Sequence, residues 1–231
     1  MLAYPYFCGV KPKLKSMNTS KEQIYNASIT VNNLANQEAI NPKELRLLQY
    51  SGPKDTCEGI ACGRLGNMAG GFHFELFGVK WYGTEHLYLC GEWSEEGDKS
   101  IEVQEYIRKM PSGVYAKRCS KAKYKDIIRK DFTQFRHQWM LWCVWQKCLL
   151  NQAFATLLKS IPEDRVIVEV VKDDPVWAAY PDEEGILRGG NAMGKILTIC
   201  RRCLKNNTQP EIDTQLLNNA GIYILGHKVK F

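Results

Sequence analysis

Residues 135–157 read FRHQWMLWCVWQKCLLNQAFATL, and this stretch decides the fold. Large residues recur in it at intervals of three and four, which is the period of one face of an α-helix. The positions that follow this spacing are Phe135, Trp139, Trp142, Gln146, Leu149, Leu150, Ala153 and Leu157. We expect one long helix at the centre of the core, ending before Pro162.

Shorter elements surround this helix on both sides in the sequence. Alternating residues on either side of Gly78, from Phe72 to Tyr82, predict a β-hairpin. Capping and periodicity predict helices over 84–93 with Thr84 as the N-cap, over 100–110 before Pro111, and over 191–204. A short helix is expected over 42–49, strands over 166–171 and 222–229, and a loop over 173–190.

The composition is that of an ordinary folded domain. The chain has 231 residues, of which 45% are hydrophobic and 24% charged, close to the averages of globular proteins. No run approaches the roughly 18 apolar residues of a membrane span, and Met1–Val10 lacks the pattern of a signal peptide. We expect a cytoplasmic protein without a membrane partner.

The nine cysteines lack the regular spacing of a disulfide scaffold. Cys57, Cys62, Cys200 and Cys203 stand in pairs that could close a zinc site, but core packing fits them better, because the CxxC pair falls inside a helical pattern. We expect neither a metal ion nor a cofactor. The polar, poorly periodic residues 1–56 are interpreted as an N-terminal extension, and residues 57–231 as the domain.

Positive charge is concentrated in one stretch of the chain. Residues 108–136 hold ten Lys or Arg against two Asp, a net +8 that exceeds the +6 of the whole chain. Interleaved Tyr and Phe residues would suit a surface that binds nucleic acid. The candidate contacts are Lys117, Arg118, Lys121 and Lys123. A solvated basic helical face explains the pattern equally well.

Four short stretches carry the residue types that cleavage of an N-glycosidic bond needs. Carboxylates can stabilise a positively charged sugar or position water, while aromatic and amide groups hold a base and a helix start holds phosphate. The stretches are Leu65-Gly66-Asn67-Met68, Trp81-Tyr82-Gly83-Thr84-Glu85-His86, Asp174-Pro175-Val176-Trp177 and Gly189-Gly190-Asn191-Ala192-Met193-Gly194.

In order and spacing these stretches resemble motifs of the NADAR (YbiA-like) family. Its members show a leucine-x-asparagine-aromatic stretch, a threonine-x-glutamate-histidine helix start, an aspartate-x-x-tryptophan loop and a late glycine-asparagine-x-x-glycine. Ala116-Lys117 resembles a further alanine-lysine element, and Arg136 with Trp139 an arginine-x-x-tryptophan element. The resemblance covers about residues 60–205.

The resemblance implies a single YbiA-like domain of the α+β class, mainly α-helical, with a small hairpin and a few short strands. It also implies a hydrolase that acts on N-glycosyl bonds of an ADP-ribosyl or ribosyl-phosphate small molecule. Three substrate types follow from it: NAD or ADP-ribose-like molecules, phosphorylated riboflavin-pathway intermediates, and guanine in DNA that carries ADP-ribose. The basic stretch favours the third.

By this resemblance Glu85 and Asp174 are the candidate catalytic carboxylates, and the helix start should favour the ionised form of Glu85. The candidate substrate-binding residues are Asn67, His86, Trp139, Trp177, Gly190 and Asn191. For Trp139, on the apolar face of the long helix, core packing fits the pattern better.

Three positions depart from the family pattern. Leu89, Glu92 and Cys143 stand where members usually have polar or basic residues, Glu92 in place of a lysine. These departures motivate an alternative function, a non-catalytic module that binds ADP-ribose, a nucleotide or nucleic acid.

Overall fold

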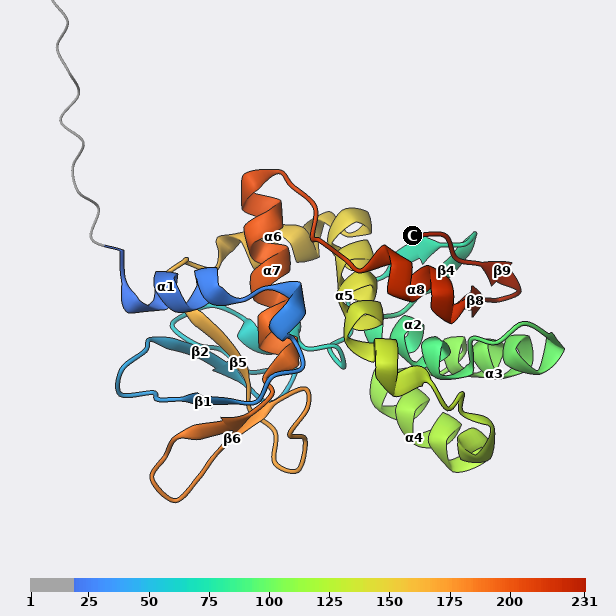
Figure 1. Ribbon diagram of the computed structural model, residues 1–231, viewed down its shortest axis with the longest axis horizontal. Coiled ribbons are helices and arrows are strands. Elements are labelled where there is room, and N and C mark those ends of the chain that lie inside the picture. Colours follow the sequence, from blue (N-terminus) through green and yellow to red (C-terminus); the bar gives the residue numbers. More distant parts are fainter. Residues whose placement is uncertain (1–18) are drawn as a thin grey trace, which may run out of the picture.

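A computed structural model describes residues 19–231 (Figure 1). The first 18 residues of the expected extension lie outside the described residues. They include Met1–Val10, where a signal peptide is not expected, and Cys8. The α-helices are α1 (Lys21–Ser28), α2 (Thr84–Cys90), α3 (Asp98–Arg108), α4 (Gly113–Tyr124), α5 (Phe132–Leu150), α6 (Gln152–Ser160), α7 (Ala192–Asn206) and α8 (Thr214–Ala220). Short 3-10 turns are η1 (Val31–Asn33), η2 (Cys62–Leu65), η3 (Gly91–Trp93) and η4 (Lys125–Ile127).

The strands are short and form four small sheets. They are β1 (Glu38–Ile40), β2 (Leu47–Tyr50), β3 (Phe74–Leu76), β4 (Val79–Trp81), β5 (Val166–Glu169), β6 (Ala179–Pro181), β7 (Leu187–Gly189), β8 (Tyr223–Ile224) and β9 (His227–Lys228). The mixed composition, dominated by helices, confirms the predicted α+β class. No helix in the part of the chain that the structure describes has both the length and the apolar character of a membrane span.

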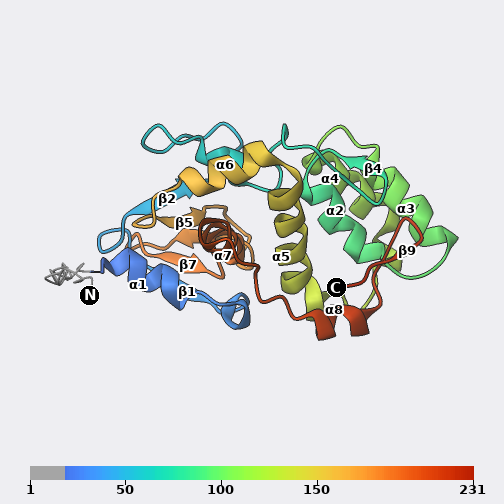
Figure 2. The ribbon, with the colours of Figure 1, turned by 90° about the horizontal axis from the view of Figure 1, so that it is seen from above.

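Helix α5 stands at the centre of the molecule, as its periodicity predicts. Figure 2 shows it between α1, α7 and strands β1, β2, β5 and β7 on one side and helices α2, α3 and α4 on the other. Phe135, Trp139, Leu141 and Cys143 of α5 are fully or almost fully buried. The core therefore forms on all sides of this helix rather than along one stripe.

The prediction of one unbroken helix over 135–157 is wrong, because the chain leaves helical geometry at Asn151 (φ −132°, ψ 99°). The Asn151 side chain accepts a hydrogen bond from Phe154 N at 2.9 Å and so caps α6. It also donates to His73 O at 2.7 Å. The apolar spacing continues through the break, so periodicity alone does not reveal it.

The sheets join segments that are distant in sequence. Strands β1, β7 and β6 form an antiparallel sheet in that order, and β2 pairs with β5 in parallel. Two of these strands, β1 and β2, come from the residues that the sequence suggests are an extension. The helix expected over 42–49 is also wrong, since Leu47–Tyr50 is a strand in which Leu48 and Tyr50 are buried and Gln49 is exposed.

Hairpins were only partly predicted. The expected hairpin around Gly78 is confirmed as β3 and β4. The single strand expected over 222–229 is instead a second hairpin, β8 and β9. The loop expected over 173–190 contains β6 and β7, which are too short to produce an alternating pattern.

The helices predicted over 84–93, 100–110 and 191–204 are confirmed within a few residues by α2 with η3, α3 and α7. Thr84 is not the N-cap of α2; the capping position is Gly83, and Thr84 is the first helical residue, fully buried. Asn191 occupies the N-cap position of α7 with a left-handed backbone (φ 42°), and its side chain makes no capping hydrogen bond.

Helix α7 and strand β5 touch through their backbones at Gly194. A Cβ atom added at Gly194 would lie 2.2 Å from Ile167 O, which is far inside van der Waals contact. Only glycine allows this approach, and the approach fixes the position of the end of β5 relative to α7.

We expect Gly194→Ala to lower the free energy of unfolding by about 1–3 kcal/mol, because helix or strand must move to admit the methyl group. Urea unfolding at neutral pH measures the change. The matched control is Gly70→Ala, where a Cβ meets nothing within 4 Å and the expected change is within about 0.5 kcal/mol. Equal stability of the two variants would contradict the close contact.

Candidate active site

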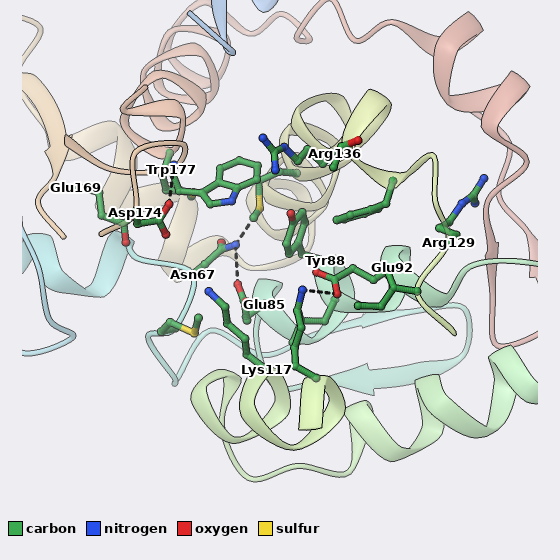
Figure 3. Close-up of a pocket in the computed structure, with 18 of the residues that line it drawn as sticks. Asn67, Glu85, Tyr88, Glu92, Lys117, Arg129, Arg136, Glu169, Asp174 and Trp177 are labelled. Carbon is green, nitrogen blue, oxygen red and sulfur yellow. Dashed lines mark hydrogen bonds and ion pairs between the residues drawn. The ribbon is translucent and has the colours of Figure 1, made fainter. Parts of the chain in front are cut away.

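A cavity of about 440 Å³ lies among α2, α4, α5, the end of β5, the loop that follows β5 and the start of α7 (Figure 3). The carboxyl-bearing residues that line it are Glu85, Glu92, Glu169 and Asp174. The basic residues that line it are Lys117, Lys121, Arg129, Lys130 and Arg136. Asn67, Tyr88 and Trp177 complete the part of the lining that offers amide and aromatic groups.

Glu85 lies in the first turn of α2 and is 4% exposed. Asn67 Nδ2 donates to its Oε2 at 3.3 Å (Figure 3). Behind it α4 approaches closely at Gly113, where a Cβ atom would lie 2.9 Å from Glu85 Cβ. Glu85 is therefore fixed from two sides with its carboxyl group in the cavity wall.

Burial raises the pKa of Glu85 to about 7, although the Lys117 ammonium group and the Asn67 amide lower it in part. From sequence we expect the helix start to favour the ionised carboxylate. That expectation is wrong, because desolvation outweighs the favourable charges. Near neutral pH Glu85 can therefore both accept and release a proton.

Glu169, at the end of β5, is a second unusual carboxyl group that the sequence motifs do not single out. Burial, followed by repulsion from Asp174 and Glu85, raises its pKa to about 8. The three carboxyl groups are thus close enough to influence one another. Ligand sites often lie at the carboxyl ends of parallel strands, and Glu169 occupies such an end. The sequence does not reveal it, because the parallel pairing of β5 with β2 cannot be read from the sequence.

Asp174 and Trp177 lie together in the loop after β5. Asp174 Oδ1 accepts a hydrogen bond from Trp177 N at 3.1 Å, which explains the three-residue offset noted in the sequence. The Trp177 ring packs edge-on to Tyr88, with ring centroids 5.5 Å apart. These two rings form an aromatic corner beside the carboxyl groups.

Gly190 and Asn191 do not line this cavity; they hold its wall in place. Asn191 Oδ1 accepts from Glu169 N at 3.2 Å, and its Nδ2 donates to Ile167 O at 3.0 Å. Gly190 N donates to Pro175 O at 2.8 Å. Asn191 therefore ties the start of α7 to β5, and Gly190 ties it to the loop that carries Asp174.

Trp139 lies in the core and not in the cavity wall. It is fully buried, its Nε1 donates to Tyr88 O at 2.9 Å, and its ring stacks on Trp142 at 5.0 Å. It supports Tyr88 from behind, which agrees with the packing interpretation of its helical position.

His86 lies on the far side of Glu85, in a neighbouring hollow of about 330 Å³ that Asn67 and Met68 also line. Its Nε2 is 3.1 Å from Met110 O, and its buried Nδ1 has no hydrogen-bond partner. Burial lowers the pKa of His86. The neutral ring with hydrogen on Nε2 fits these contacts, and it does not reach the carboxyl-lined cavity.

The four basic residues selected from the sequence separate into two pairs. Lys117 and Lys121 line the cavity, and Lys121 Nζ forms an ion pair with Glu92 Oε2 at 2.7 Å. Arg118 and Lys123 are exposed and do not line it; Lys123 Nζ lies 4.7 Å from the centroid of the Tyr106 ring. The basic stretch therefore contributes to the cavity as well as to the surface.

Three cations of the cavity keep their charge available. Among the described residues, Lys117, Lys130 and Arg136 have no carboxylate within ion-pair distance. Arg136 Nε is buried without a partner. Arg129 differs, because Asp131 holds its guanidinium through Oδ1 at 2.7 Å. Lys117, Lys130 and Arg136 are therefore the lining groups whose charge is free to meet an anion.

Over residues 19–231 no three His, Cys, Asp or Glu side chains are grouped as a metal ion would require. Cys57, Cys62, Cys200 and Cys203 are all free thiols, and Cys200 and Cys203 are buried in α7.

Comparison with known proteins identifies the fold. The sequence matches no family model, and the curated proteins contain no significant match to it. The fold is similar to the NMR structure of the E. coli protein YbiA, with a TM-score of 0.54 and 21% identity over 70% of this chain and 86% of that chain. The chain therefore has a YbiA-like fold, as the motif resemblance implies.

The buried carboxyl groups predict a specific pH dependence of stability. Between the ordinary pKa of 4.5 and the raised values, the folded chain binds more protons than the unfolded chain, so stability falls as pH rises. We expect Glu85→Gln and Glu169→Gln each to raise the free energy of unfolding at pH 8 by about 1–3 kcal/mol, with the gain vanishing near pH 4.5. Urea unfolding at both pH values tests this, and the exposed Glu184→Gln serves as the control.

Proposed function

We propose that this protein is an N-glycosidase that hydrolyses the N-glycosidic bond of an ADP-ribosyl or ribosyl-phosphate compound. The observation that carries the proposal is the convergence of Glu85, Glu169 and Asp174 on one cavity that Lys117 and Arg136 also line. The carboxyl groups suit a sugar that becomes positively charged, and the basic residues suit phosphate. The YbiA-like fold and the four ordered motifs support the same family of activities.

In the proposed reaction the bond between C1′ of the ribose and the base nitrogen breaks, and its electron pair stays on the nitrogen. Glu169, protonated at neutral pH because its pKa is raised to about 8, supplies the proton for the leaving nitrogen. Water attacks C1′, and ionised Glu85 takes the water proton. Asp174 stabilises the cationic sugar between the two steps.

The remaining groups of the cavity provide binding. Lys117 and Arg136, which have no carboxylate partner, take the phosphate groups. Tyr88 and Trp177 offer their rings to the base, with Asn67 as an amide partner for base or ribose. Exposed Arg118 and Lys123, on the same helix as Lys117, would contact a DNA backbone if the ribose were attached to guanine in DNA.

A non-catalytic binding module is the second candidate function, and one observation favours it. Glu92, which replaces a lysine of the family pattern, is buried, forms an ion pair with the partly exposed Lys121 and adds negative charge to the cavity. This changes the contacts that a substrate would meet. Such a module would bind ADP-ribose without releasing any product.

A product screen distinguishes the two candidates. Wild-type protein is incubated with NAD, ADP-ribose, ribosylaminopyrimidine phosphates and ADP-ribosylated DNA, and mass spectrometry detects a free base or sugar. We expect turnover of at least one substrate, and a fall of about 10²-fold or more in Glu85→Gln and Glu169→Gln. Glu184→Gln, in an exposed turn, should retain full activity. If the wild-type protein releases no product but binds ADP-ribose, the second candidate, the non-catalytic binding module, is supported instead.

The raised pKa values also predict the shape of the pH profile. The general base, Glu85, must be ionised and the general acid, Glu169, must be protonated. The value of kcat/KM should therefore rise as Glu85 ionises near pH 7 and fall as Glu169 ionises near pH 8. Glu85 and Glu169 interact, so the apparent pKa values of the two limbs of the pH profile describe the pair rather than either residue alone. Residual activity of Glu169→Gln should lack the alkaline limb. An unchanged profile in that variant would remove Glu169 from the role of acid.

A further inference from the structure

A second cavity, of about 480 Å³, lies between α1 and the C-terminal half of α7. Figure 1 and Figure 2 show these two helices on the side of the molecule away from α2, α3 and α4. Its described lining residues include none of those around the candidate active site. A function at this cavity would therefore be additional to hydrolysis.

Three cationic side chains of α7 line this cavity: Arg201, Arg202 and Lys205. Backbone carbonyl groups hold all three. Arg201 Nη1 donates to Pro162 O at 2.8 Å, Arg202 Nη2 to Ile29 O at 3.0 Å, and Lys205 Nζ to Ile161 O at 3.2 Å. Hydrogen bonds to neutral carbonyl groups orient these cations but do not neutralise their positive charge.

The positive charge is only partly balanced. Among the described lining residues the single carboxylate is Glu163, whose Oε1 is 3.5 Å from Lys205 Nζ and whose side chain is 61% exposed. The lining therefore keeps a net charge of +2, from three cations and one anion. Burial lowers the pKa of Arg201 to about 10, as expected for a guanidinium without a close counter-charge.

Two buried oxygen atoms in the same lining lack hydrogen-bond partners. They are Thr198 Oγ1 and Asn26 Oδ1, in residues that are 2% and 8% exposed. The Asn26 amide orientation is fixed, because Nδ2 donates to Glu163 O at 2.8 Å and Arg165 O at 3.1 Å. Asn26 Oδ1 therefore needs a donor from outside the protein, such as a hydroxyl group.

We propose that this cavity binds a small organic phosphate that also carries a hydroxyl group. The phosphate pairs with Arg201, Arg202 and Lys205, and the hydroxyl donates to Asn26 Oδ1 within reach of Thr198. A phosphate monoester carries nearly two negative charges at neutral pH and matches the net +2 better than a carboxylate does. The volume is in the range of small-molecule sites.

Isothermal titration calorimetry on the full chain tests the ligand class. The probes are glucose 6-phosphate and glycerol 3-phosphate, compared with glucose, glucuronate and inorganic phosphate. We expect saturable binding of at least one sugar or polyol phosphate, no binding of glucose, and at least about tenfold weaker binding of glucuronate and inorganic phosphate. Absence of binding by both organic phosphates would overturn the proposal. If inorganic phosphate bound as tightly as the organic phosphates, the proposed role of the ligand hydroxyl group would be overturned.

Variants locate the binding. Arg202→Gln and Lys205→Met should each raise Kd at least about tenfold, and exposed Lys125→Met, outside both cavities, should not change it. Thr198→Val should raise Kd while leaving Tm unchanged, because its hydroxyl has no partner within the protein. Glu85→Gln should bind as wild type does. Unchanged affinity in Arg202→Gln and Lys205→Met, or loss in Glu85→Gln, would place the ligand elsewhere.

Discussion

The contact on which both the fold and the candidate site depend is the backbone approach of α7 to β5 at Gly194. Because no side chain separates them, Asn191 at the start of α7 can bond to both Ile167 and Glu169. The end of β5 is thereby fixed, and with it the Glu169 carboxyl group. The same helix supplies Arg201, Arg202 and Lys205 to the second cavity. One rigid element thus determines the geometry of both cavities.

The candidate site combines buried carboxyl groups with cations that are not neutralised. The carboxyl groups are unfavourable for stability, because desolvation penalises the charged forms of Glu85 and Glu169. Lys117 is exposed and Arg136 is half-buried. The site places carboxyl groups and cations side by side in one cavity. Such an arrangement suits a ligand that combines anionic phosphate with a sugar that becomes cationic.

Sequence predicted what local interactions determine. The hairpin at Gly78, α2, α3 and α7 follow from periodicity and turn residues, and Asn67, Glu85, Asp174 and Trp177 do line one cavity. The sequence does not predict the features that depend on contacts between residues distant in the chain. Asn151 breaks the central helix through a bond to His73, β2 becomes a strand through pairing with β5, and Glu169 acquires its unusual pKa only when Asp174 and Glu85 are brought beside it.

The parallel pairing of β2 with β5 has a kinetic consequence. The two strands are separated by residues 51–165, which include α2 to α6. Parallel pairing over so long a loop carries a large closure entropy and is slow compared with helix formation. The helical half, with Glu85, can therefore assemble early, whereas Glu169 reaches its place only when the loop closes. The carboxyl groups are then brought together, and the pKa of Glu169 rises, only at this late stage of folding.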